Sequence, residues 1–124
     1  MKHLYTAFIA CLCCLTLSFS LGQDKKIHVA LFDDEGSGNT GIENVEKALL
    51  AELNIEVQRI SAEDIRSGIL HSFDIVVFSG GRGSKQAAAI ESRGLDSVRQ
   101  FVKQGGGYLG ICAGAYLSTV EYPW

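Results

Sequence analysis

The chain has 124 residues, a formal net charge of −3 and a hydrophobic fraction of 47%. This length accommodates one domain at most. The slightly acidic balance, with scattered lysines and arginines, gives no support for nucleic-acid or anionic-membrane binding.

Residues 1–22 have the pattern of a secretory signal peptide. A short basic start precedes an apolar run, and the small residues Ser20 and Gly22 fit a cleavage site after position 22. We therefore predict export to a periplasmic or extracellular compartment, with residues 23–124 as the mature domain and no membrane association after cleavage. The alternatives are an uncleaved membrane anchor, because the run approaches the length of a membrane span, and a lipid-anchored cysteine.

Cleavage would also change the cysteine content of the chain. Cys11, Cys13 and Cys14 lie in the predicted signal, so Cys112 would be the only cysteine of the mature domain. No intramolecular disulfide could then form, and a free thiol in an exported protein needs an explanation. Cys112 is therefore the first candidate for chemistry.

The first half of the mature chain predicts two β-α units. An apolar strand and a polar loop precede a helix in which Thr40 and Glu43 have the spacing of a capping box. A segment of alternating polarity then predicts a strand near the sheet edge, and a serine and a glycine bound a short helix. The apolar residues that share one face of the first helix are Ile42, Val45, Leu49 and Leu53. The predicted elements are strand 26–32, helix 40–53, strand 55–60 and helix 61–68.

The second half predicts two further strands, each followed by helical segments. A continuous apolar stretch that runs into glycines indicates a strand covered on both faces. Two helical segments follow it, and Gly105 can end the second of them. A glycine-rich stretch predicts the fourth strand, and another helix begins at Ala113. The predicted elements are strand 73–81, helix 84–92, helix 94–106 and strand 107–112.

The alternation of strands and helices predicts a parallel sheet with helices on both faces. Right-handed crossovers leave few topologies, and we predict a flavodoxin-like, three-layer α/β sandwich with strand order 2-1-3-4. Strands one, three and four are the most apolar, so this order leaves an apolar strand at an open edge, which favours aggregation. We interpret this as a domain whose C-terminal part is missing from the chain.

The ligands of a parallel sheet bind at the carboxyl ends of its strands, where the loops after strands one, three and four should meet. The loop after strand four carries Cys112, with a glycine two residues before it and another two residues after it. This is the pattern of a nucleophile elbow, and the amino end of the following helix would favour the thiolate. The alternative is a buried structural cysteine.

The loop after strand three offers the other candidate groups. The backbone N–H groups of Gly80 and Gly81 could converge with that of Ala113 to form an oxyanion hole, although a plain turn has the same pattern. Arg82 and Lys85 could hold a substrate carboxylate, or could be solvated loop charges. The glycines lack the spacing of a phosphate-binding loop, which argues against nucleotide binding.

No cofactor or metal ion is predicted, because no grouping of histidine, cysteine and carboxylate residues has ligand spacing. The acidic residues Asp33, Asp34 and Glu35 could orient a base, contact the thiol or bind a cation, although a solvated acidic loop is the favoured interpretation. A cysteine nucleophile usually needs a histidine base. His3 would leave with the signal, His28 lies within the first strand, and His71 precedes the third strand. No catalytic triad can therefore be assembled from this sequence.

Three stretches, "VALFDDEGSG", "DIVVFSGGRG" and above all "FVKQGGGYLGICAGAYLS", resemble the biotin-protein ligase N-terminal-like family. That family belongs to the class I glutamine amidotransferase-like superfamily, and the resemblance covers residues 27–120. It implies a flavodoxin-like fold, with Cys112 at the nucleophile position and with Gly81 and Ala113 at the oxyanion positions. The chain has Ser79 where the family often has proline.

The resemblance also implies what this chain does not contain. Working amidotransferases use a histidine and an acidic residue downstream of the cysteine, and the sequence ends before that region. The catalytic domain of the biotin ligases is absent as well, so biotin transfer is not expected.

We therefore expect an exported domain capable, when complete, of thiol-dependent amide or ester hydrolysis on a small-molecule or peptide substrate. Without a base, this chain should be inactive. The alternative is a non-catalytic module that binds a small carboxylate or a peptide through loop amides, Arg82 and Lys85. A redox-reactive thiol at Cys112 is a third possibility.

Overall fold

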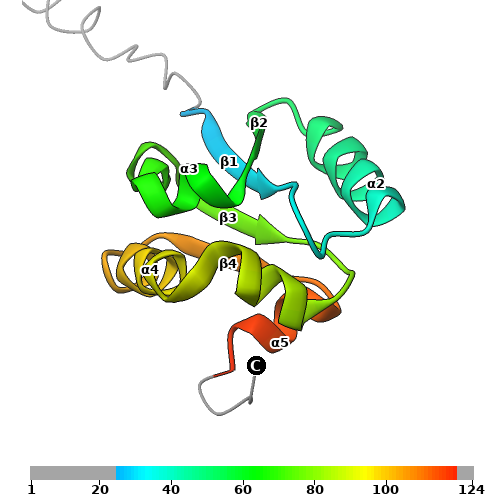
Figure 1. The fold of residues 1–124 in the computed structure, drawn as a ribbon. Helices are drawn as coiled ribbons and strands as arrows, with labels where there is room; N and C mark the ends of the chain where they lie inside the picture. Colours follow the sequence, from blue (N-terminus) through cyan, green and yellow to red (C-terminus); the bar gives the residue numbers. More distant parts are fainter. Residues whose placement is uncertain (1–24, 120–124) are drawn as a thin grey trace, which may run out of the picture.

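The computed structural model describes residues 25–119 (Figure 1). The predicted export signal, residues 1–22, lies outside the described residues, as do residues 120–124. The elements in chain order are β1 (Ile27–Phe32), α2 (Asn39–Leu50), β2 (Ile55–Ile60), α3 (Ala62–Ser67), the 3-10 helix η1 (Ile69–Ser72), β3 (Ile75–Phe78), α4 (Gly83–Lys103), β4 (Gly107–Gly110) and α5 (Ala113–Leu117).

The four strands form one parallel sheet in the order β2-β1-β3-β4. Figure 1 shows α2 on one side of this sheet and α3 and α4 on the other. The predicted flavodoxin-like α/β sandwich and its strand order 2-1-3-4 are therefore confirmed. This order places the loop after β3 between the loop after β1 and the turn after β4, at the carboxyl ends of the strands.

Two apolar clusters hold the layers together, one on each face of the sheet. Alternation along β1 sends Val29 and Leu31 toward α2, and Ala30 and Phe32 toward α3 and α4. On the α4 side the aromatic rings continue across the sheet, because the ring centroids of Phe32 and Phe78 are 4.9 Å apart. β3 is covered on both faces, as its continuous hydrophobicity predicted.

The start of α2 differs from the prediction. Its N-cap is Gly38 and no side chain caps it, so the capping box predicted from Thr40 and Glu43 is wrong. The reason is a contact distant in sequence: the N–H of Gly38 donates to the carbonyl oxygen of Gly80 at 2.9 Å. The carbonyl of Gly38 accepts from the N–H of Ile42, and the helix begins there.

The end of α2 also differs. The helix stops at Leu50, so Leu53 falls in the following turn and is fully exposed instead of lying on the apolar face. The short helix α3 matches its prediction. Ser61 and Asp64 form a reciprocal capping box, and Gly68 ends the helix in the left-handed conformation.

The two helical segments predicted between residues 84 and 106 form α4, which has a kink at Glu91 (φ 58°, ψ 176°). Gly105, with φ 99°, follows the helix as expected. The third and fourth strands are shorter than predicted, because residues 79–81 and Cys112 belong to loops. None of the helices between residues 25 and 119 has both the length and the apolar character needed to cross a bilayer.

Candidate functional site at the β4–α5 turn

Cys112 lies in the sharp turn between β4 and α5, where its thiol is free and exposed. Its backbone has φ 53° and ψ −111°. A positive φ is uncommon for a residue with a side chain, and such strain costs about 1–3 kcal/mol and concentrates at functional sites. The backbone therefore bends sharply at Cys112, between the end of β4 and the start of α5.

The turn depends on two glycines that allow β4, α5 and β3 to approach closely. A Cβ atom on Gly110 would lie 2.5 Å from the carbonyl oxygen of Gly114, and one on Gly114 would lie 2.1 Å from that of Phe78. The N–H of Ile111 donates to the Phe78 carbonyl at 2.9 Å. The hydroxyl of Tyr108 donates to the Gly114 carbonyl at 2.6 Å. Burial raises the pKa of Tyr108, which keeps this donor protonated.

A short antiparallel bridge joins the loops after β1 and β3. It pairs Ser37 with Gly81 through two hydrogen bonds made by flanking residues. The N–H of Gly38 donates to the Gly80 carbonyl at 2.9 Å, and the N–H of Arg82 donates to the Gly36 carbonyl at 2.7 Å. The bridge leaves the N–H of Gly81 unused. A Cβ on Gly81 would lie 2.0 Å from the Gly36 oxygen, so this position requires glycine.

The bridge also determines where the Gly81 N–H points. In a trans peptide the carbonyl and the following N–H point in opposite directions, and no described peptide bond is cis. Gly38 holds the Gly80 carbonyl on the β1 side of β3, so the Gly81 N–H points to the other side of β3. The β4–α5 turn lies on that other side. Gly80 itself packs against Cys112: a Cβ there would lie 3.5 Å from the Cys112 Cβ and 3.9 Å from its Sγ.

A second unused amide comes from Ala113. It is the first residue of α5, so its N–H has no acceptor within the helix. The amides of the next two residues are engaged, because Gly114 donates to Ile111 and Ala115 donates to Cys112. The described α5 has five residues, so fewer peptide dipoles point at the thiol than a longer helix would supply.

A cavity of about 310 Å³ opens over Cys112. It brings together four of the predicted site residues, Cys112, Gly81, Ala113 and Arg82, whereas Gly80 is not part of its lining. Lys85 is not part of its lining, and the Lys85 ammonium lies 3.3 Å from a carboxylate oxygen of Glu35. The lining residues are Gly81, Arg82, Gly83, Ser84, Cys112, Ala113 and Tyr116.

Sequence reasoning did not single out Ser84 and Tyr116 as residues of this cavity. Ser84 begins the predicted helix 84–92, and its hydroxyl belongs to no motif that we recognised. Tyr116 follows Ala113 by three residues, a spacing that places both on one face of a helix. That spacing was the available signal.

The acidic loop after β1 connects the sheet to its neighbouring elements. The carboxylate of Asp33 lies 3.0 Å from the guanidinium of Arg59, which also pairs with Glu46. These two carboxylates raise the pKa of Arg59. The carboxylate of Asp34 accepts from the N–H of Ala62 at 2.8 Å. These contacts favour the structural interpretation of the loop over a catalytic one.

The described histidines lie toward the opposite end of the sheet. The His28 ring nitrogen is 3.4 Å from a Glu56 carboxylate oxygen near the start of β1. His71 contacts the Gly68 carbonyl at 2.6 Å in η1, before β3 begins. Within residues 25–119, then, no histidine lines the Cys112 cavity, and no cluster of three potential metal ligands occurs.

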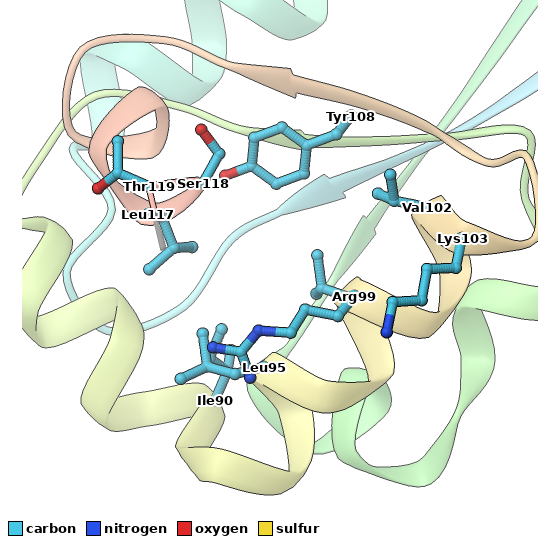
Figure 2. A pocket seen from close by; sticks show the side chains of 10 residues that line it. Ile90, Leu95, Arg99, Val102, Lys103, Tyr108, Leu117, Ser118 and Thr119 are labelled. Carbon is cyan, nitrogen blue, oxygen red and sulfur yellow. The ribbon is translucent and has the colours of Figure 1, made fainter. Parts of the chain in front are cut away.

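A second cavity, of about 420 Å³, lies between α4, β4 and α5. Figure 2 shows side chains of α4 on one side of it, and Tyr108 and Leu117 on the other. The cavity is larger than the one at Cys112, but it is mainly apolar, and no cysteine or histidine is among its lining residues. Its lining residues are Ile90, Leu95, Val98, Arg99, Val102, Lys103, Tyr108, Leu117, Ser118 and Thr119.

Comparison with known families gives a match over most of the chain. The family model described as "Biotin-protein ligase, N terminal" matches residues 27–124, a range that includes all four strands and the Cys112 cavity. The resemblance found in the three sequence stretches is therefore confirmed. No curated protein matches the chain.

Proposed function

The chain belongs to the biotin-protein ligase N-terminal family, and from that premise we propose that its Cys112 cavity is a thiol-dependent acyl-transfer site. The observation that supports this most strongly is the strained backbone of Cys112, with φ 53° at the β4–α5 turn. In a nucleophile elbow, the same kind of turn exposes the nucleophile above a parallel sheet. The unused amides of Gly81 and Ala113 supply the second element of such a site.

The proposed reaction begins with attack of the Cys112 thiolate on the carbonyl carbon of an amide or ester. As the C–S bond forms, the π electrons of the carbonyl move onto its oxygen. The N–H groups of Gly81 and Ala113 donate to this negative oxygen, which they stabilise most when its charge is greatest. The carbonyl then re-forms and the amine or alcohol leaves, which gives a thioester. Water hydrolyses the thioester to an acid and the free thiol.

The remaining cavity residues favour a substrate with a carboxylate or a peptide group near the reacting carbonyl. Arg82 lines the cavity and forms no ion pair with another described residue, so its guanidinium is available. Lys85 adds positive charge outside the lining, where Glu35 partly neutralises it. Gly80 lies beside the thiol, because a Cβ atom at its position would be 3.5 Å from the Cys112 Cβ and 3.9 Å from its Sγ.

Proton transfer limits the proposed activity of this chain. An amine leaving group must be protonated as it departs, and the described residues place no histidine in the cavity. A phenolate leaving group needs no such proton. We therefore expect rapid acylation by an activated ester, followed by slow release, and no rapid hydrolysis of amides.

The test is the reaction of the purified protein with p-nitrophenyl acetate. We expect a burst of one equivalent of nitrophenolate, with one acetyl group on Cys112 in the peptide map. Cys112→Ala should abolish the burst. Ser84→Ala, which removes the serine hydroxyl of the same cavity, should leave it intact. Acetylation of Cys112 at the rate of a small-molecule thiol would contradict the proposal.

The absence of a histidine among the described residues that line the cavity also supports a second candidate, a non-catalytic module that binds a carboxylate or peptide there. In that case the loop amides and Arg82 would carry the affinity. Cys112→Ala would retain a ligand identified by screening, and Arg82→Ala would lose it. Loss of binding in Cys112→Ala would favour the acyl-transfer proposal.

We further propose that the chain is exported and that residues 1–22 are removed. The basic start, the apolar run and the small residues at its end support this. N-terminal sequencing of the protein released from an exporting host should begin at Gln23. A membrane-bound product that retains Met1 would indicate an anchor instead.

A further inference from the structure

A glutamine of α4 is completely buried and contacts the segment that leads from β3 to Gly80 and Gly81. Gln86 has no exposed surface, and its Nε2 donates to the carbonyl oxygen of Ser79 at 3.1 Å. Its Oε1 has no hydrogen-bond partner, and among the side chains of residues 25–119 no other buried nitrogen or oxygen is in that state. The hydrogen bond to Ser79 is therefore the one polar contact that orients this side-chain amide.

The acceptor of that hydrogen bond belongs to the segment that carries the Gly81 amide, one of the two proposed oxyanion donors. Ser79 is itself fully buried, so water cannot replace Gln86 at its carbonyl. The Ser79 carbonyl and the Gly80 N–H belong to one planar peptide, so fixing one fixes the other. The next peptide is held from the opposite side, where Gly38 donates to the Gly80 carbonyl. Two donors on different elements thus set two consecutive peptide planes.

These external donors matter because the segment contains two consecutive glycines. Gly80 and Gly81 have no side chains to restrict their backbone torsions, and Gly81 has φ 152°. A peptide plane released on one side can rotate at little cost. Rotation of the Ser79–Gly80 peptide would shift Gly80, which packs on Cys112, and with it the N–H of Gly81.

The energetics indicate that Gln86 contributes little net stability. A buried acceptor without a partner is unfavourable, and Gln86 keeps one such atom while it satisfies another. A methionine of similar length would remove the unpaired Oε1 but would leave the Ser79 carbonyl unpaired instead. One unsatisfied acceptor is exchanged for another, so the fold gains little from glutamine, whereas the direction of the Ser79 carbonyl depends on it.

We propose that Gln86 is a positioning residue of the Cys112 site, which holds the Ser79–Gly80 peptide so that the Gly81 N–H is directed at the oxyanion. This role deepens the proposed acyl transfer and rests on it. Gln86 does not touch the substrate in this account, since it is absent from the cavity lining. It acts through the backbone of Ser79 and Gly80.

The test compares two reactions of the same thiol. Acylation by p-nitrophenyl acetate passes through an oxyanion, whereas alkylation by iodoacetamide displaces iodide without one. Gln86→Met should slow acylation about tenfold or more, because a misplaced oxyanion donor loses much of its effect. Alkylation should stay within about twofold, and the melting temperature within about 5 °C of the wild type.

Ile90→Val is the matched control, because it alters a buried α4 side chain one turn away that has no polar group to bond the Ser79 carbonyl. It should change neither rate, although it lowers stability. If Gln86→Met leaves acylation unchanged, or slows both reactions equally, the positioning role is wrong.

A second measurement keeps this inference separate from the proposed function. In amide NMR spectra, Gln86→Met should shift the Gly80 and Gly81 resonances and speed their hydrogen exchange, and Ile90→Val should not. If wild-type Cys112 is not acylated, the acyl-transfer proposal fails while these spectra still test the positioning. Unchanged resonances of Gly80 and Gly81 would overturn it.

Discussion

The substitution Gly114→Ala should destabilise the protein strongly, because it puts a methyl group where α5 crosses β3. The new Cβ would lie 2.1 Å from the carbonyl oxygen of Phe78 and 2.7 Å from its carbonyl carbon and Cβ. Phe78 is fully buried in a central strand, and its carbonyl already accepts from Ile111, so β3 cannot yield. To restore van der Waals contact, α5 must move by about 1 Å, which weakens the packing beneath it.

We expect a loss of about 3 kcal/mol or more in the free energy of unfolding, the upper end of the cost of overpacking. This is a large share of the stability of a domain of this size. Urea denaturation followed by circular dichroism measures it. Gly80→Ala is the matched control, because its Cβ would make ordinary contacts of 3.5 and 3.9 Å with Cys112. That variant should stay within about 1 kcal/mol of the wild type. If Gly114→Ala is as stable as Gly80→Ala, the tight turn described here is wrong.

Further predictions concern backbone strain, pH and the sheet edge. Cys112→Gly should be more stable than Cys112→Ala by about 1 kcal/mol, because glycine adopts the positive φ of this position without strain. Alanine is the more stabilising residue at most positions, so a more stable Cys112→Ala in urea denaturation would contradict this. Hydrogen bonds from Ser61 hold the pKa of Asp64 below its usual value. The stability they give is therefore present above about pH 4 and is lost as the pH falls through the lower pKa of the folded state. Asp64→Asn should remove this part of the pH dependence of unfolding, and an unchanged dependence of the unfolding free energy on pH would refute it. Leu109 is exposed on the edge strand β4, so the purified protein should self-associate. Leu109→Lys should reduce this self-association in sedimentation experiments. A monomeric wild-type protein would contradict the prediction.

The parts of the fold that follow from local chemistry were predictable from the sequence. Ser61 and Gly68 bound α3 as expected, because caps involve residues a few positions apart. The capping box at Thr40 failed because a hydrogen bond from Gly38 to the distant Gly80 fixes the start of α2 one residue earlier than the predicted helix. Such a contact depends on how the loops pack, which no local pattern records.

The same distinction applies to the site. The glycine spacing around Cys112 predicted the sharp turn, because close approach of strand and helix needs small residues at those positions. The bridge between Ser37 and Gly81 has no sequence signal, since it joins two loops through backbone atoms. Gln86 left a weak signal, because it precedes the buried Ile90 by four residues and therefore shares its face of α4.

The most direct test of the account is to measure both reactions of Cys112 in the native protein and in the same protein unfolded in urea. The ratio of acylation rate to alkylation rate removes differences in thiol exposure and ionisation. If the amides of Gly81 and Ala113 are positioned for an oxyanion, folding should raise this ratio about tenfold or more. An equal ratio in the folded and unfolded protein would show that the turn presents a thiol without an oxyanion site.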